Sequence, residues 1–276
     1  MKISLIVTTY NRKDALKLVL WSAIKQTVPP MEILIADDGS SDGTDSLVAE
    51  VHNNTLINII HCWQVDMGFR AARGRNLAIA AATGDYLVFV DGDMILEKSF
   101  LEDHQRAAQK GYFIQGGRVL FDEIKTKKVI HDQTLTLSWW EMGVRNRKNC
   151  LRSRFLATIF STTTTKLAGI RTCNFAAWKD DVVAINGFNE NFIGWGREDS
   201  EFAARLLHSG VNRKNLRFQA VAYHLFHGLQ QRSSLKENDA ILHETLMKKL
   251  TWCSNGLDQH IMTGAPTRRE GANGMA

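Results

Sequence analysis

The stretch YLVFVDGD, residues 86–93, decides the fold class of this 276-residue chain. Its first five residues are apolar and rich in β-formers, and an acid–glycine–acid turn follows them directly. The preceding segments alternate between strand and helix patterns: strands over 3–8, 32–36 and 57–62, and helices over 14–26 and 71–82. Such alternation predicts an α/β fold, with a mainly parallel sheet that helices cover on both faces. The second half is less regular: strands are predicted over 114–121 and 218–224 and a helix over 235–252, while residues 122–172 are predicted to be rich in loops.

Polar motifs follow three of these predicted strands. They are TTYNR at residues 8–12, DDGS at 37–40 and DGD at 91–93. In open α/β sheets, ligands bind outside the carboxyl ends of the strands. The three motifs are therefore expected to converge on one edge of the sheet and to form a ligand site there.

The DGD turn has the composition of a cation site. Asp91 and Asp93 are two residues apart, and Gly92 between them allows a ligand to approach closely. Magnesium and manganese are typically held by one or two carboxylates together with substrate phosphates. A polar turn that only ends a strand is the simpler explanation, but the two neighbouring polar strand ends favour the metal hypothesis.

The other two motifs suggest a nucleoside pocket. Asp38 could accept hydrogen bonds from a base or ribose, although a helix cap would also explain an acid there. Thr8 and Tyr10 could complete the pocket, and Arg12 could meet a phosphate. Residues 68–76, GFRAARGRN, place further polar side chains on one face of a predicted helix: Arg70, Arg73 and Asn76. This face is either exposed to solvent or holds the helix over a diphosphate.

Taken in order, TTYNR, DDGSSDGT, GFRAARGRN and VFVDGD resemble the N-terminal half of family-2 glycosyltransferases of the GT-A fold. The later stretch NGFNENFIGWGREDSEFAARLL, residues 186–207, resembles a signature shared by galactosyltransferases and bacterial chondroitin-type polymerases. The resemblance spans roughly residues 1–230. It implies a nucleotide-diphospho-sugar transferase fold and an enzyme that binds a nucleotide-diphosphate sugar with a divalent metal and inverts the anomeric centre.

The resemblance also assigns residues in the second half of the chain. Asp199 matches the family's catalytic base, at a predicted helix start that favours its ionised form, and Glu198 is expected to orient the acceptor or the loop. Trp195 could lie against a sugar face, and Gly196 could let the loop close. The family often has glycine at the position of Arg197, which leaves the acceptor contacts open.

Three further positions are expected to complete the site. His227 best matches the family's late metal ligand, with His224 as the substitute and a polar strand end as the simpler explanation. Residues 171–181 resemble the segment that lines the donor sugar. Asn174 and Trp178 could contact that sugar, and core packing is the alternative for Trp178.

The resemblance implies a manganese or magnesium cofactor, a UDP-sugar donor and a glycan or lipid-linked glycan acceptor, in surface polysaccharide or lipopolysaccharide synthesis. We expect one catalytic domain over residues 1–262. Its first part, 1–121, would bind the nucleotide sugar and its second part, 122–262, the acceptor. The composition of residues 263–276 predicts a disordered tail.

The net charge of +5 is compatible with a phosphorylated substrate, an anionic membrane or nucleic acid. We expect no nucleic-acid partner. Residues 145–160 combine a basic run with apolar residues and could touch a membrane, although a solvated loop and a core helix would explain them equally. No apolar run has the length of a signal peptide core or a membrane span, so a cytoplasmic location is expected.

Alternative functions are less compatible with these motifs. A dinucleotide-dependent oxidoreductase would need GxGxxG after its first strand, which the chain lacks. A sugar nucleotidyltransferase would need a glycine-rich loop at the same place. A non-catalytic nucleotide- or glycan-binding module would explain the charge, but it would need neither the DGD turn nor Asp199.

Overall fold

A computed structural model describes residues 1–135, 140–228 and 233–262 of the chain, so the predicted tail lies outside the described residues. The strands are β1 (Ile3–Thr9), β2 (Glu32–Asp37), β3 (Asn58–Trp63), β4 (Tyr86–Asp91), β5 (Met94–Leu96), β6 (Tyr112–Gln115), β7 (Val119–Phe121), β8 (Val144–Arg145), β9 (Thr162–Thr164), β10 (Asn174–Trp178), β11 (Asn212–Asn215) and β12 (Ala222–His224). The helices are α1 (Lys13–Ile24), α2 (Thr44–Asn53), α3 (Ala71–Ala81), α4 (Phe100–Ala107), α5 (Glu123–Asp132), α6 (Arg154–Phe160), α7 (Lys179–Ala184), α8 (Glu198–His208), α9 (Leu235–Met247) and α10 (Asp258–Met262), with a 3-10 helix, η1, at Arg147–Cys150.

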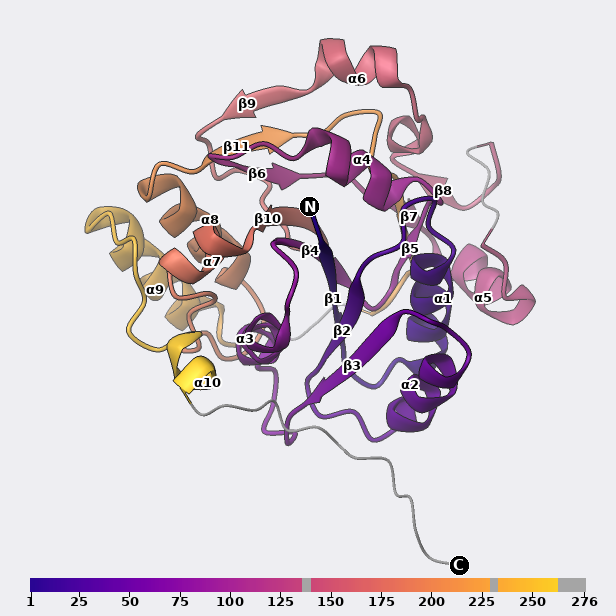
Figure 1. Cartoon of the computed structure of the whole chain (residues 1–276), viewed down its shortest axis with the longest axis horizontal. Coiled ribbons are helices and arrows are strands. Elements are labelled where there is room, and N and C mark those ends of the chain that lie inside the picture. The colour runs from indigo at the N-terminus through magenta and orange to yellow at the C-terminus, as the bar shows by residue number, and fades with distance from the viewer. Residues whose placement is uncertain (136–139, 229–232, 263–276) are drawn as a thin grey trace, which may run out of the picture.

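Two sheets organise these elements (Figure 1). The large sheet has the order β3-β2-β1-β4-β10-β6-β11-β9, and the small one has the order β5-β12-β7-β8. The pairs among β1, β2, β3 and β4 are all parallel, whereas β10 runs antiparallel to both β4 and β6. The predicted α/β fold is confirmed, and both halves of the chain contribute strands to its large sheet.

Helices cover both faces of the large sheet. Successive side chains of a strand point to opposite faces. Leu5 and Val7 accordingly pack in one buried cluster with α1, α2 and α4, and Ile6 packs in another with α3, α7 and α8. Figure 1 shows α1 and α2 on one side of the central strands and α3, α7 and α8 on the other. Burial on both faces explains why these strands read as continuous apolar runs.

Residues 114–121, which read as one strand, are split between the two sheets. β6 ends at Gln115 and β7 begins at Val119. The chain turns away at Gly116, whose N–H donates to the Asn174 carbonyl at 2.8 Å. A Cβ atom on Gly116 would lie 2.3 Å from the Asn174 side chain, so only glycine fits there. This break sends the loop around Arg118 towards the carboxyl end of the sheet.

The second half differs from expectation in other places as well. The predicted strand at 218–224 is extended only over β12, because Phe218 and Ala220 have φ angles of 57° and 48°. α5 forms in a region whose sequence reads as irregular. α9 ends at Met247, five residues before the predicted end at 252, and Lys249 just beyond it has a φ of 48°. Positive φ interrupts regular structure in both places.

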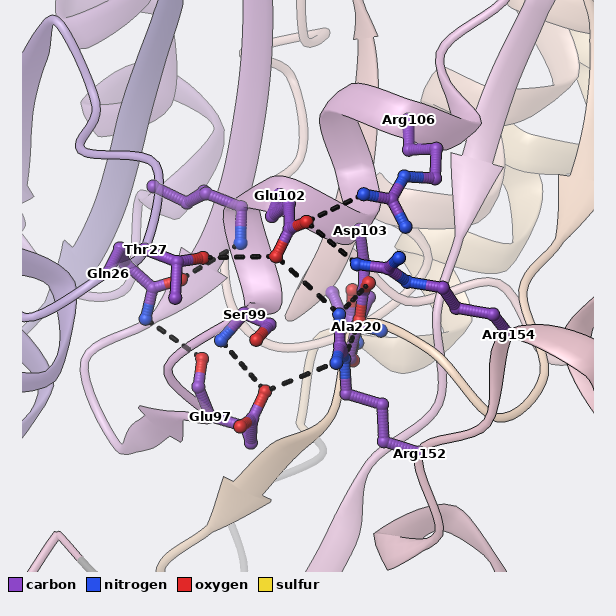
Figure 2. A network of polar contacts seen from close by, with 12 residues as sticks. Gln26, Thr27, Glu97, Ser99, Glu102, Asp103, Arg106, Arg152, Arg154 and Ala220 are labelled. Carbon is purple, nitrogen blue, oxygen red and sulfur yellow. Dashed lines mark hydrogen bonds and ion pairs between the residues drawn. The ribbon is translucent and has the colours of Figure 1, made fainter.

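The segment that precedes α6 is anchored to α4 by arginine–carboxylate pairs (Figure 2). Arg152 donates from Nε and Nη2 to the carboxylate of Asp103, at 2.9 and 2.7 Å, and Asp103 is fully buried. Arg154 and Arg106 both donate to Glu102, at 3.1 and 2.6 Å. Two cations of the basic run are therefore used within the chain.

Apolar side chains are exposed on α6 and at Leu151, which directly precedes Arg152. We call these side chains the α6 patch, and their exposed fractions lie between 49% and 74%: Leu151, Phe155, Ile159 and Phe160. Throughout the described part of the chain, no helix combines the length and the apolarity that crossing a membrane requires.

Candidate active site

The carboxyl ends of β1 and β4 border a cavity of about 1470 Å³. The TTYNR, DDGS and DGD motifs all line it, so their predicted convergence is observed. Residues at the start of α3, among them Arg75, also line it. Most of the remaining lining comes from later in the chain: Arg118, Leu120, Phe121, Asp122, Arg145, Gly169, Ile170, Arg171, Cys173, residues 193–200, His224, Phe226, His227 and residues 233–235 at the start of α9. The cavity thus has a first wall built by the N-terminal strands and a second wall built by later loops.

The DGD turn is fixed by its contact with β1. The register of β1 and β4 places Thr8 beside Asp91, and Thr8 Oγ1 donates to Asp91 Oδ1 at 3.0 Å. The N–H of Gly92 donates to the Thr8 carbonyl at 2.6 Å. A Cβ atom at position 92 would lie 2.7 Å from that carbonyl oxygen, so the turn requires glycine.

Asp93, His224 and His227 form a group whose candidate ligand atoms all lie within 4.8 Å of one another. β12 pairs antiparallel with β5 and sets His224 opposite Met94, which brings both imidazoles to the acid. Asp93 Oδ1 is buried and, among the described residues, has no hydrogen-bond partner. A carboxylate with two imidazoles and one uncommitted oxygen fits a divalent cation. Asp91 lies outside this group.

Arg12 balances the charge of Asp93 in this arrangement. Its Nη1 lies 2.8 Å from Asp93 Oδ2, and its Nη2 donates to the Phe226 carbonyl at 3.1 Å. Burial raises the pKa of Asp93, and Arg12 opposes that shift. The guanidinium therefore joins the first wall to the strand end that carries both histidines.

The residues predicted to form a nucleoside pocket, Thr8, Tyr10 and Asp38, all line the cavity, and the acid is already hydrogen-bonded. Asp38 is buried and lines the cavity, and it accepts from the backbone N–H of Arg70 at 2.7 Å and from the amide of Gln64. Burial raises its pKa. Tyr10 is 45% exposed at the rim, and its hydroxyl donates to Asp66 at 2.8 Å. The Tyr10 ring is thus held in place beside open space.

α3 turns Arg75 towards the cavity, and not Arg70 or Arg73. Arg70 donates to the carbonyl of Val65, and Arg73 donates to Gln64 at 2.7 Å, away from the lining. Nothing in the sequence pattern separates Arg75 from its neighbours, because tertiary packing sets the rotation of the helix against the sheet.

Arg75 faces the three acids at the centre of the cavity. Its side chain is buried, and its guanidinium nitrogens lie 3.8 Å from Asp91, 3.5 Å from Glu198 and 3.6 Å from Asp199. The acids raise the pKa of Arg75 against the opposing effect of burial. A permanent cation thus holds together acids from the DGD turn and from the start of α8.

The two acids that begin α8 have different environments. Asp199 Oδ1 accepts from the hydroxyl of Thr172 at 2.7 Å, and Oδ2 accepts from its N–H at 3.0 Å. Its side chain is 23% exposed on the cavity. Glu198 is buried, and burial, followed by the charge of Asp199, raises its pKa to about 7. Thr172, which orients Asp199, was not identified from the sequence.

The loop before α8 has backbone angles that favour glycine. Gly194, Gly196 and Arg197 have φ angles of 77°, 109° and 75°. A Cβ atom on Gly194 would lie 2.4 Å from Ser234 Oγ at the start of α9. Trp195 is 39% exposed and lines the cavity with Gly196, and Arg197 pairs with Asp239 of α9 at 2.5 Å.

A model described as glycosyl transferase family 2 matches residues 4–172, more than half of the chain. The chain belongs to glycosyl transferase family 2. A second model, described as the N-terminal domain of galactosyltransferase, matches residues 156–228. This second match includes Asp199, His224 and His227, so the two models together cover most residues of both walls of the cavity.

Curated relatives are similar in sequence to this chain over most of its length. Chondroitin synthase from Escherichia coli is 25% identical over 248 residues, which are 80% of this chain and 34% of that protein. Hyaluronan synthase from Pasteurella multocida is 28% identical over 249 residues, 80% of this chain and 24% of that protein. The glycosyltransferase thus spans about a third or less of the length of these relatives.

Solved structures show the fold. S. aureus TarS in complex with UDP-GlcNAc aligns with a TM-score of 0.63 at 17% identity, over 94% of this chain and 69% of that one. A mannosyltransferase from Pyrobaculum calidifontis in complex with GDP-Man and Mn2+ aligns with a TM-score of 0.57 at 16% identity, over 90% of this chain and 72% of that one. The predicted GT-A fold of the glycosyltransferase is confirmed.

Two residues expected at the donor sugar lie outside the cavity lining of the glycosyltransferase. Asn174 is fully buried, and its amide donates to the carbonyls of Gly117 and Ala220. Trp178 lies at the other end of β10, where its ring packs edge-on against Tyr86 at 5.1 Å. Asn174 therefore supports the second wall from below, and Trp178 belongs to the core.

Proposed function

We propose that this glycosyltransferase is an inverting, metal-dependent enzyme that moves a sugar from a UDP-sugar to a hydroxyl of a glycan or glycolipid. The observation that carries the proposal is the position of Arg75, which links the DGD turn to Asp199 within one cavity. Arg75 thereby holds two groups side by side. The DGD turn could hold a diphosphate through a cation, and Asp199 could accept a proton.

Asp199 would act as the general base. An acceptor hydroxyl would attack the anomeric carbon of the donor, the bond from that carbon to the phosphate oxygen would break, and UDP would leave. The hydroxyl proton would pass to Asp199, whose orientation Thr172 sets through two hydrogen bonds. Attack opposite the leaving group inverts the anomeric centre. Glu198 would stay behind Asp199, against Arg75.

Asp93, His224 and His227 would hold a manganese or magnesium ion, with Asp91 facing the same space. When bound, such a cation would neutralise charge on the departing diphosphate. The uncommitted oxygen of Asp93 supports this assignment. A solved structure of similar fold was obtained with GDP-Man and Mn2+.

The first wall would hold the nucleoside of the donor. Tyr10 presents its ring at the rim, where a base could stack, and Thr8 and Asp38 face the cavity beneath it. A TarS structure of similar fold was obtained with UDP-GlcNAc, which supports uridine as the base. The second wall, which residues 122–262 and the loop around Arg118 supply, would then receive the acceptor.

The α6 patch supports a lipid-linked acceptor in surface polysaccharide or lipopolysaccharide synthesis. Its four apolar side chains lie close in sequence to the exposed cations Arg145 and Lys148. Exposed apolar residues beside cations are typical of peripheral binding to anionic membranes. The chain would then work at the inner face of a membrane.

Hydrolysis of a panel of UDP-sugars by the purified protein tests the proposal, with and without manganese. We expect slow release of UDP from one donor, dependent on the metal and lost in Asp93→Ala. Asp180→Ala is the matched control, because Asp180 is 91% exposed and lies outside the cavity. Metal-independent release, or equal loss in both variants, would contradict the proposal.

A further inference from the structure

The cavity contains arginines of two kinds. Arg12, Arg75 and Arg197 each lie within 4.0 Å of a carboxylate. A second set, which we call the open arginines, also lines the cavity but has no carboxylate within that distance anywhere in the described ranges: Arg118, Arg145 and Arg171. All three belong to the second wall. Arg118 is partly buried, and the other two are exposed.

Two open arginines are linked, through neighbouring residues, to the segment that holds the proposed base. Arg171 directly precedes Thr172, whose N–H and hydroxyl hold Asp199. Arg118 Nη1 lies 3.9 Å from the sulfur of Cys173, on the other side of Thr172. Because a base must touch the hydroxyl that it deprotonates, the acceptor has to enter the cavity that Asp199 and these two cations line.

The third open arginine joins them through the small sheet. β7 and β8 pair antiparallel, with Arg145 opposite Leu120, two residues beyond Arg118. The acid nearest in sequence on this wall is Asp122, whose carboxylate caps α5 by accepting from the Lys125 N–H at 2.8 Å. The open arginines therefore form a cationic surface without a carboxylate within 4.0 Å in the described residues. Arg118 also opposes, after Arg12 and His227, the rise that burial causes in the pKa of Asp93.

We propose that the open arginines recognise an anionic acceptor, a glycan that carries a carboxylate or a phosphate close to the hydroxyl that is glycosylated. The inference rests on the proposed function and adds the chemical class of the acceptor. A guanidinium presents paired donors that match the two oxygens of a carboxylate or phosphate. Three such groups in the cavity that holds the base would favour a charged acceptor over its neutral analogue.

The donor diphosphate carries the same oxyanion chemistry, so the test has to separate the two ligands. Arg12 and the Asp93 group belong to the first wall and its neighbouring strand end, where the diphosphate is proposed to lie. If the open arginines serve the acceptor, their removal leaves UDP binding intact. If they serve the diphosphate, UDP binding falls.

The experiment measures binding of two matched pairs of probes to the full chain with manganese and UDP. One pair is a glucuronate-containing oligosaccharide and its carboxyl-reduced form, and the other is a disaccharide 6-phosphate and its unphosphorylated parent. We expect one charged probe to bind at least about tenfold more tightly than its neutral partner, since a hydrogen bond to a charged group contributes about that factor. The pair that shows the preference distinguishes carboxylate from phosphate.

Single variants assign the effect to residues. Arg118→Gln and Arg171→Gln should each reduce the preference at least threefold and leave the affinity for UDP within twofold of wild type, on the order expected for one charged contact. Arg217→Gln is the control, because Arg217 is exposed, has no carboxylate within 4.0 Å in the described residues and lies outside the cavity. The guanidinium groups of Arg118 and Arg171 form no ion pair within the described residues, so both variants should fold.

Equal affinity for the charged and neutral members of both pairs, the absence of binding included, would overturn the inference. Loss of UDP affinity in the Arg118 or Arg171 variant would also overturn it, since the arginines would then serve the donor. Failure of the wild type to bind UDP with manganese would instead contradict the proposed function, so the two failures are distinguishable.

Discussion

The two walls of the cavity are built in different ways. In the first wall, Thr8, Asp38 and Asp91 follow neighbouring parallel strands, so the pairing of β1 with β2 and β4 alone brings them together. In the second wall, Arg118 comes from the loop between β6 and β7, and Asp199 comes from the first turn of α8. Long-range contacts hold these segments, for example the amide of Asn174, which donates to the carbonyls of Gly117 and Ala220.

The difference extends to charge. The first wall pairs its cation with its own acid, as in Arg12 and Asp93. The second wall leaves three arginines without acids in the described part of the chain. Under the proposed function, the first wall would hold the donor and its cation, and the second wall would present a cationic surface to the acceptor. Four predictions test this division.

The largest effect should follow Asp199→Asn, which removes the base from the second wall. Transfer to an acceptor should fall by about 10² to 10⁴, the usual contribution of a general base. The affinity for UDP with manganese should stay within about threefold of wild type, because the first wall is unchanged. Steady-state kinetics and calorimetry measure the two effects. Near-normal transfer would show that another group takes the proton.

Arg152→Met should detach the segment that precedes α6 from α4. The substitution leaves the fully buried carboxylate of Asp103 without its cation. Breaking such a pair costs about 3–5 kcal/mol of unfolding free energy. Arg106→Met, at an exposed pair with Glu102, should cost less than about 1 kcal/mol. Urea unfolding measures both, and equal small losses would show that the anchor is unimportant.

Acid should weaken the second wall through His104. Burial lowers the pKa of this histidine to about 4, and its Nε2 lies 2.9 Å from the Asn174 side-chain oxygen. The unfolded chain, with a histidine pKa of about 6.5, binds more protons between these two values. The free energy of unfolding should therefore fall by roughly 3 kcal/mol as the pH drops from about 6.5 to 4, and stay level at higher pH as far as this group is concerned.

The control for this prediction is His104→Gln, which cannot gain the proton. Its unfolding free energy should depend less on pH, by about 1.4 kcal/mol per pH unit within the window. Other groups titrate in both proteins, so the difference between their curves isolates His104. Parallel curves would refute this origin of the acid sensitivity.

The smallest effect should come from Arg197, which has a φ of 75° at a position where the family often has glycine. Arg197→Gly should change the unfolding free energy by less than about 1 kcal/mol, because relief of strain offsets the lost pair with Asp239. Arg197→Val should cost more than about 1 kcal/mol, since a β-branched residue tolerates positive φ poorly. Thermal unfolding ranks the three proteins, and a Val variant as stable as the Gly variant would contradict the explanation.

Sequence patterns predicted the first wall well because it depends on local features. A buried strand followed by a polar turn is visible in the letters of residues 86–93, and parallel pairing then places the turn. The need for glycine at positions 92, 194 and 196 was also predictable. A Cβ atom would make a close contact at position 92, and the backbone has a positive φ at positions 194 and 196.

The same patterns could not predict features that depend on packing. The rotation of α3 selects Arg75 instead of Arg73, and no spacing within the helix determines that rotation. Asn174 and Trp178 share a short strand, yet one supports the loops of the second wall and the other packs at the opposite end against Tyr86. Thr172 orients Asp199 from 27 residues away in the chain, a contact that only the tertiary structure reveals.

Calorimetric titration with UDP, in the presence and absence of manganese, tests the central claim most directly. The account predicts manganese-dependent binding to the wild-type protein and to Asp199→Asn, and its loss in Asp93→Ala. That outcome would assign the donor and its cation to the first wall and the proton transfer to the second. UDP binding that does not depend on manganese, or that is retained in Asp93→Ala, would contradict this assignment.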